Sequence, residues 1–184
     1  MMENLYCVSL AASVIALIFA WLQSKKVLAF SEGTPLMQKI SRAIRTGASA
    51  FLKRQYRTVA IFFACMFCGM AAAGFVTWFV PFAFVTGGFF SGLSGFIGMT
   101  IATRANCRTA AAAQEGLNRG LRIAFSAGSV MGFTVVGLGL LDISLWYAVM
   151  KLIFHSSLEE ITAAMITFGM GASSMALFAR VGGG

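Results

Sequence analysis

The chain has 184 residues, of which 59% are hydrophobic and 11% charged, and its 14 Lys and Arg outnumber its 6 Asp and Glu to give a net charge of +8. A charged share so far below the roughly 25% of soluble domains excludes an ordinary water-soluble fold. The apolar residues instead form blocks of about 18 to 24, the length that a helix needs to cross about 30 Å of hydrocarbon. We therefore predict an all-α integral membrane protein with about five transmembrane helices.

The first apolar block covers residues 5–22, and its flanking charges resemble those of a retained anchor. No basic residue precedes it, whereas Lys25 and Lys26 follow it directly. A secretory signal peptide has the opposite arrangement, with its positive charge before the apolar run. Because positive charge stays on the cytoplasmic side, the N-terminus is expected outside.

A basic segment, residues 23–57, separates the first block from the second. Its apolar residues Leu36, Ile40 and Ile44 recur at helical spacing after Pro35, a residue that favours the first turn of a helix. This pattern predicts a helix that runs along the cytoplasmic membrane surface and turns into the second span.

The second span is expected at 59–80, ending near Trp78 and Pro81, an interfacial aromatic and a helix breaker. The third span, 82–103, contains three overlapping pairs of small residues at i and i+4. Such pairs let helix backbones approach closely, so they predict a tightly packed bundle.

The fourth and fifth spans are expected at 123–145 and 161–179, with a second basic segment at 104–122. Alternating five spans places both basic segments on one side, and these segments hold twelve of the 14 basic residues. This is the positive-inside asymmetry of membrane insertion. It accounts for the net charge and makes nucleic acid a poor candidate partner.

Few residues carry an obvious chemical signature. Cys65 and Cys68 form a CxxC, but inside an apolar run, where packing is the expected role and a zinc site is not. Asp142 follows an apolar run and could be an ion ligand, although Trp146 one turn later favours a place at the membrane interface. The only histidine, His155, is expected to be solvated in an outer loop.

Three longer motifs carry a family resemblance: GASAFLKRQY at 47–56, GFIGMTIATRANCRTAAAA at 95–113 and FGMGASSMALFARVGGG at 168–184. Their order and spacing resemble the membrane-bound inorganic pyrophosphatases, which are pyrophosphate-energised proton or sodium pumps. The resemblance implies a homodimer with about sixteen membrane helices per subunit. Hydrolysis of magnesium pyrophosphate at the cytoplasmic face would drive H+ or Na+ outward, with K+ as a further candidate cofactor.

The resemblance assigns one functional residue. Arg180, just before the terminal glycines, resembles the family's ion-gate arginine, which pairs with carboxylates and a lysine of helices outside this chain. Ser173 and Ser174 lie deeper in the same helix and are candidate lining residues of the ion path. A guanidinium stays charged at every physiological pH, so it can keep a gate carboxylate ionised.

The 184 residues are therefore expected to be a single membrane domain, the N-terminal part of such a pump in a bacterial plasma membrane. The family's lysine and aspartates that bind magnesium pyrophosphate follow the glycine run, so this stretch has no catalytic or metal-binding residue of its own and is expected to be inactive alone. The alternative is a stand-alone five-helix protein without enzymatic activity that packs against a partner and binds anionic lipids.

Overall fold

The computed structural model describes residues 5–73 and 78–183, and this part of the chain is helical, without strands. Its helices are α1 (Leu5–Leu28), α2 (Pro35–Ala72), α3 (Phe79–Glu115), α4 (Leu117–Ala148), the π-helical turn η2 (Val149–Ile153) and α5 (Leu158–Gly183). Five helical segments are long and apolar enough to cross a membrane. The predicted fold class, an all-α membrane protein with five spanning helices, is confirmed.

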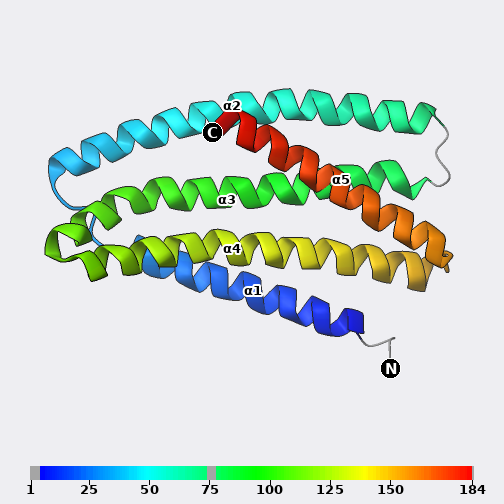
Figure 1. Ribbon diagram of the computed structural model, residues 1–184, viewed down its shortest axis with the longest axis horizontal. Helices are drawn as coiled ribbons and strands as arrows, with labels where there is room; N and C mark the ends of the chain where they lie inside the picture. The colour runs from blue at the N-terminus through cyan, green and yellow to red at the C-terminus, as the bar shows by residue number, and fades with distance from the viewer. Residues whose placement is uncertain (1–4, 74–77, 184) are drawn as a thin grey trace.

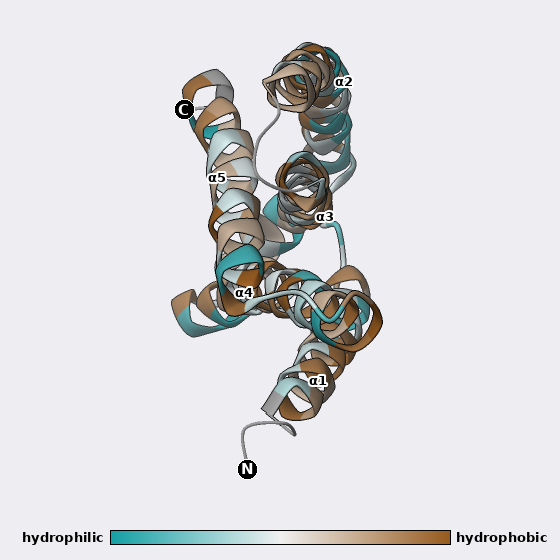
Figure 2. Cartoon of the chain, turned by 90° about the vertical axis from the view of Figure 1, so that its right-hand side faces the viewer, coloured by the Kyte–Doolittle hydropathy of each residue, from teal (hydrophilic) through white to brown (hydrophobic). Residues whose placement is uncertain are grey.

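Helices α3 and α4 lie side by side at the centre of the bundle (Figure 1). α1 packs against α4 on one side, whereas α2 and α5 both pack against α3 on the other. Seen from the end, α2 stands at the edge of the bundle, and α3 is its main neighbour (Figure 2). One long side of α2 is therefore left without a neighbouring helix in the described part of the chain.

The helix boundaries differ from the predicted spans between the second and third helices. α2 runs without a break from Pro35 to Ala72, so the expected surface helix and most of the second span are one helix. α3 begins at Phe79 and holds Pro81 in its first turn. A helix tolerates proline there because the missing N–H would have no intrahelical partner, so Pro81 belongs to a helix start. The predicted span 59–80 thus covers the end of one helix, the undescribed residues 74–77 and the start of the next.

Small residues bring the central helices into close contact. A Cβ on Gly98 would collide with Met131 of α4, and one on Gly137 would come within 2.9 Å of Leu17 of α1. Backbone-to-side-chain contact of this kind is typical of membrane bundles, in which shape complementarity replaces the hydrophobic driving force.

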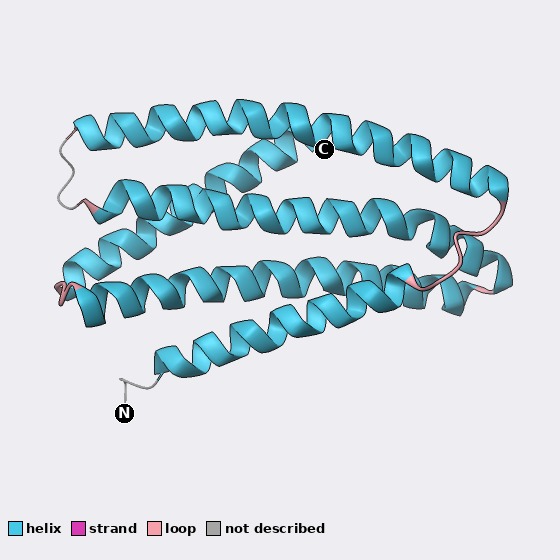
Figure 3. Ribbon diagram, turned by 180° about the vertical axis from the view of Figure 1, so that it is seen from behind, coloured by secondary structure: helices cyan, strands magenta, loops and turns pink. Residues whose placement is uncertain are grey.

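The basic segments gather at one end of the bundle. The C-terminal ends of α1 and α3 and the N-terminal ends of α2 and α4 meet there, with the loop between α1 and α2 crossing the same end (Figure 3). This end, which we call the basic end, holds residues 104–122 and the start of the basic segment 23–57, together with the ion pairs described below, and the rest of that segment follows α2 along the bundle.

Candidate functional site

Helix α5 crosses α3 at two glycines, which fixes the face that α5 presents to the rest of the protein. A Cβ on Gly87 or on Gly171 would collide with a backbone carbonyl of the facing helix. Close by, the Ser91 hydroxyl donates a hydrogen bond to the carbonyl of Ala172 at 3.2 Å. Since the narrow face of α5 containing Gly171 is used for this crossing, a different face is left for other contacts.

That other face is made of small residues and ends in the predicted gate arginine. Gly169, Ser173, Ala176 and Arg180 follow one another at spacings of four, three and four, which aligns them along one side of a helix. All four are exposed, and a Cβ on Gly169 would meet nothing within 4 Å. No described helix covers this face, which we call the open face of α5.

Arg180 lies in the last turn of α5, and the C-terminal end of this helix points toward the basic end and stops partway along the bundle (Figure 1). Within residues 5–73 and 78–183 its guanidinium makes no salt bridge. The five donors of this charged group are thus available to acceptors from outside the described bundle.

The two candidate path-lining serines are separated by the structure. Ser173 lies on the open face with Arg180, whereas Ser174 is one residue, and about 100°, further around the helix. The Ser174 hydroxyl donates to the carbonyl of Met170 in its own helix at 2.8 Å. Of the two, Ser173 alone shares a face with the predicted gate residue.

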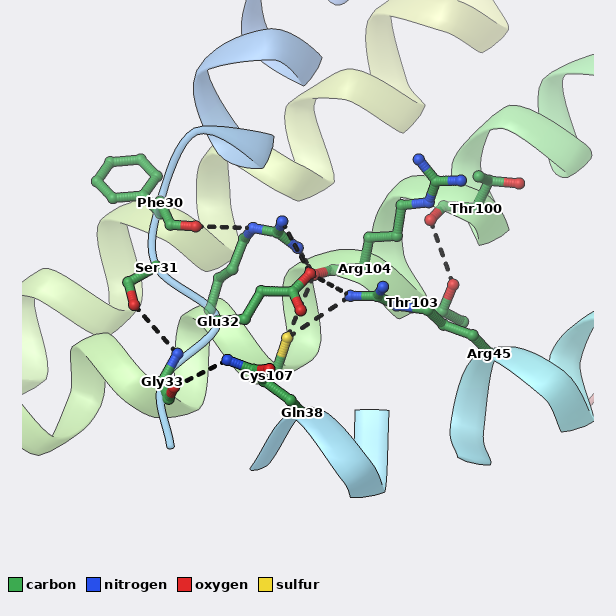
Figure 4. Close-up of polar contacts among 11 residues, drawn as sticks. Phe30, Ser31, Glu32, Gly33, Gln38, Arg45, Thr100, Thr103, Arg104 and Cys107 are labelled. Atoms are coloured by element: carbon green, nitrogen blue, oxygen red, sulfur yellow. Dashed lines mark hydrogen bonds and ion pairs between the residues drawn. The ribbon is translucent and has the colours of Figure 1, made fainter. Parts of the chain in front are cut away.

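A second polar site, which sequence reasoning missed, is an ion-pair cluster at the basic end (Figure 4). The Glu32 carboxylate accepts from Nη2 of Arg45 at 2.7 Å and lies 3.0 Å from Nη2 of Arg108. Arg108 also donates to the carbonyl of Phe30 from Nε at 2.9 Å. This cluster therefore joins the loop between α1 and α2 to both α2 and α3.

The buried member of the cluster is Arg108, whose side chain is only 10% exposed. A buried guanidinium is stable only where its charge and donors are paired, and Glu32 and the Phe30 carbonyl supply this pairing. The two arginines in turn hold the pKa of Glu32 below its ordinary value, chiefly through the hydrogen bond from Arg45. The one available signal was that Glu32 is the single acid among the eight basic residues of 23–57.

The structure corrects the interpretation of Asp142 as an interfacial residue. It is 3% exposed and buried in α4, with Oδ2 lacking a hydrogen-bond partner in the described part of the chain. Close by, Trp146 donates from Nε1 to the hydroxyl of Thr86 in α3 at 2.8 Å, so this aromatic ring points into the bundle. The Trp146 ring therefore packs between α3 and α4 and does not show how deep Asp142 lies in the membrane.

The described residues do not fit a magnesium site. Nowhere in residues 5–73 and 78–183 do three His, Cys, Asp or Glu side chains converge. Mg²⁺ prefers carboxylate and water oxygens, yet the Glu32 carboxylate is already paired with two guanidinium groups. Any magnesium that the family's chemistry needs would have to be held by other residues.

Comparison with known proteins identifies the family. The family model described as Inorganic H+ pyrophosphatase matches residues 14–184, nearly the whole chain. The chain belongs to this family. The resemblance seen in the three sequence motifs is thereby confirmed.

The curated relatives that match the chain are longer proteins named as ion pumps. A protein of Bacteroides thetaiotaomicron with the provisional name of a K+-stimulated pyrophosphate-energized sodium pump is 53% identical over 94% of the chain. A Clostridium tetani protein with the same provisional name is 44% identical over the full chain. A K+-insensitive pyrophosphate-energized proton pump 2 of Moorella thermoacetica is 42% identical over 95% of it.

The chain spans about a quarter of the length of these relatives. The two relatives named as sodium pumps are 53% and 44% identical to the chain, and the one named as a proton pump is 42% identical.

Proposed function

We propose that this chain is the N-terminal membrane part of an ion-translocating pyrophosphatase. The complete protein would hydrolyse magnesium pyrophosphate at the basic end and move H+ or Na+ to the opposite side. The family match and the pump names of the relatives support this proposal.

Arg180 is proposed as the member of the ion gate that this chain contributes. The observation that carries this assignment is its position at the basic-end terminus of the open face of α5, in line with Ser173. A guanidinium in that position keeps its charge and can bind carboxylates of further helices in the planar, two-pronged geometry that lysine lacks. When pyrophosphate binds, an exchange of these carboxylate partners would open or close the path.

The orientation in the membrane follows from the charge distribution. We propose that the basic end is cytoplasmic and the N-terminus outside, in a multi-pass protein of the bacterial plasma membrane. Twelve of the 14 basic residues lie in the two segments at that end, and such segments are retained on the cytoplasmic side during insertion.

Assembly and cofactors are proposed from the resemblance. The complete pump would be a homodimer that uses Mg²⁺, with K+ as an activator in some members. Because the described residues offer no convergent set of carboxylates, these 184 residues alone are expected not to hydrolyse pyrophosphate.

The test is Arg180→Lys in the full-length protein, reconstituted in vesicles. We expect pyrophosphate binding to persist, whereas hydrolysis, ion transport or the ratio between them falls at least ten-fold. Lysine keeps the positive charge but lacks the planar guanidinium that donates two parallel hydrogen bonds. Arg122→Lys, at an exposed arginine of the basic end, is the matched control and should behave as wild type. Wild-type hydrolysis and transport in the Arg180→Lys protein would remove Arg180 from the mechanism.

The two serines provide a second, independent comparison. Ser173→Leu should block the path and lower ion transport, since this side chain shares the open face with Arg180. Ser174→Leu should have a smaller effect, because its hydroxyl is bonded within α5. Equal transport rates in the two variants would mean that the open face of α5 does not line the path.

A further inference from the structure

We propose that the groove between α2 and α3 is a binding site for one anionic phospholipid, with its headgroup at the basic end and an acyl chain along the bundle. This site would be separate from the open face of α5 and does not depend on the proposed gate. It is made of two adjoining cavities, of about 840 Å³ and about 390 Å³, which both touch Tyr56 and Phe96.

The larger cavity is apolar and has the length of one leaflet. Its wall on α2 runs from Tyr56 to Cys68, and its wall on α3 is formed by Phe82, Phe89 and other residues up to Phe96. The twelve helical steps from Tyr56 to Cys68 cover about 18 Å at about 1.5 Å per step, close to the roughly 15 Å of one hydrocarbon leaflet. An acyl chain laid between these aromatic side chains would be in an environment as apolar as the bilayer.

Tyr56 lies where the two cavities meet and lines both of them. Its hydroxyl donates to the carbonyl of Gly92 across the groove at 2.6 Å. The polar tip is therefore satisfied by α3, while the ring lines both cavities. Tyr56 therefore marks the change from the apolar to the basic part of the groove.

The smaller cavity is the basic mouth of the groove. Lys53 and Arg45 of α2 and Arg104 of α3 line it, together with hydroxyl groups such as that of Thr100. Of these, Lys53 and Arg104 make no salt bridge in the part of the chain that the structure describes. Arg45 is paired through Nη2, but its buried Nε has no acceptor among those residues. Two cations without a salt bridge, beside the paired Arg45, complement a phosphodiester at this mouth.

The combination of features favours a lipid over a packed helix. A helix packed in this groove would have to end beside a carboxylate-rich segment to complement the basic side chains at the mouth. A phospholipid supplies the apolar length and the negative charge in one molecule.

The experiment uses the full-length protein in mild detergent, incubated with equal amounts of phosphatidylglycerol and phosphatidylcholine and analysed by native mass spectrometry. We expect one phosphatidylglycerol to be retained per subunit in preference to phosphatidylcholine. The double variant Lys53→Gln/Arg104→Gln should lower that affinity roughly thirty-fold, at about five-fold for each basic side chain near an anionic surface. Excess inorganic phosphate should not displace the lipid, because the acyl chain contributes most of the contact.

The matched control is Arg119→Gln/Arg122→Gln, which removes the same charge from exposed positions of the basic end outside the groove. It should retain phosphatidylglycerol as wild type does. Ala64→Trp fills the apolar cavity and should abolish retention, whereas Ala71→Trp, on α2 but outside the cavity, should not. Equal losses in both charge variants, no headgroup preference, or displacement by phosphate would overturn the proposal.

Discussion

The ion-pair cluster at the basic end offers the sharpest test of the structure, through the substitution Arg108→Met. Methionine keeps most of the apolar length of arginine but removes the ion pair with Glu32 and the hydrogen bond to the Phe30 carbonyl. Glu32 retains Arg45, so its charge stays paired. The carbonyls of Phe30 and Arg104 also lose the hydrogen bonds that the Arg108 side chain donates to them.

The free energy lost in Arg108→Met follows from the burial of Arg108, whose side chain is 10% exposed. Losing a charge-assisted hydrogen bond and leaving a half-buried carbonyl without its donor costs about 2–4 kcal/mol in total. The substitution destabilises the packed conformation of the loop between α1 and α2 by this amount. Local opening should therefore become roughly thirty- to nine-hundred-fold more frequent.

Hydrogen exchange measured by mass spectrometry, on the full-length protein in nanodiscs, reports this opening directly. The amides to follow are those of residues 29–38, including Phe30, which donates to the Val27 carbonyl, and Gln38, which donates to that of Thr34. We expect their exchange to accelerate by the stated factor, while the centre of α4 exchanges as in wild type.

The matched control is Arg119→Met, which removes a solvent-exposed arginine–glutamate ion pair. Arg119 binds Glu115 one turn earlier, but the two side chains are 67% and 57% exposed. An exposed pair of this kind contributes about 0.5 kcal/mol or less, so exchange should change by no more than about three-fold. If Arg108→Met changed exchange no more than Arg119→Met does, the cluster would not fasten the loop.

Two further predictions follow from single contacts. Because the pKa of Glu32 is lowered in the folded state, its carboxylate stabilises the protein fully at pH values above the ordinary pKa of a glutamate. This stabilisation is lost as the pH falls through the lowered pKa. Acidification should therefore increase protease cleavage in 29–34, and Glu32→Gln should remove this pH dependence. Gly171→Val should weaken the α3–α5 contact by about 1–3 kcal/mol, because its Cβ would collide with a backbone carbonyl. The control Gly128→Val, at a glycine with open space around it, should keep a wild-type melting temperature, and equal losses in both would contradict the crossing geometry.

The membrane fold and its charge asymmetry are readable from the sequence, because lipid imposes length and polarity on each segment independently of the others. A helix must be about 20 residues long and apolar to cross, and positive charge marks the retained side. The family, too, was recognisable, since long motifs such as that at 168–184 lie in one continuous stretch.

Tertiary structure alone decided which side chains meet. Glu32 of the loop between α1 and α2 is paired with Arg108 of α3, and periodicity within one segment contains no information about such pairs. Asp142 is buried within the bundle, and the contact of Trp146 with Thr86 of α3 could not be predicted from their distance in sequence. The sequence does not distinguish Ser173 from Ser174. The packing of Gly171 on α3 fixes the rotation of α5 about its axis, and this rotation places the two serines on different faces.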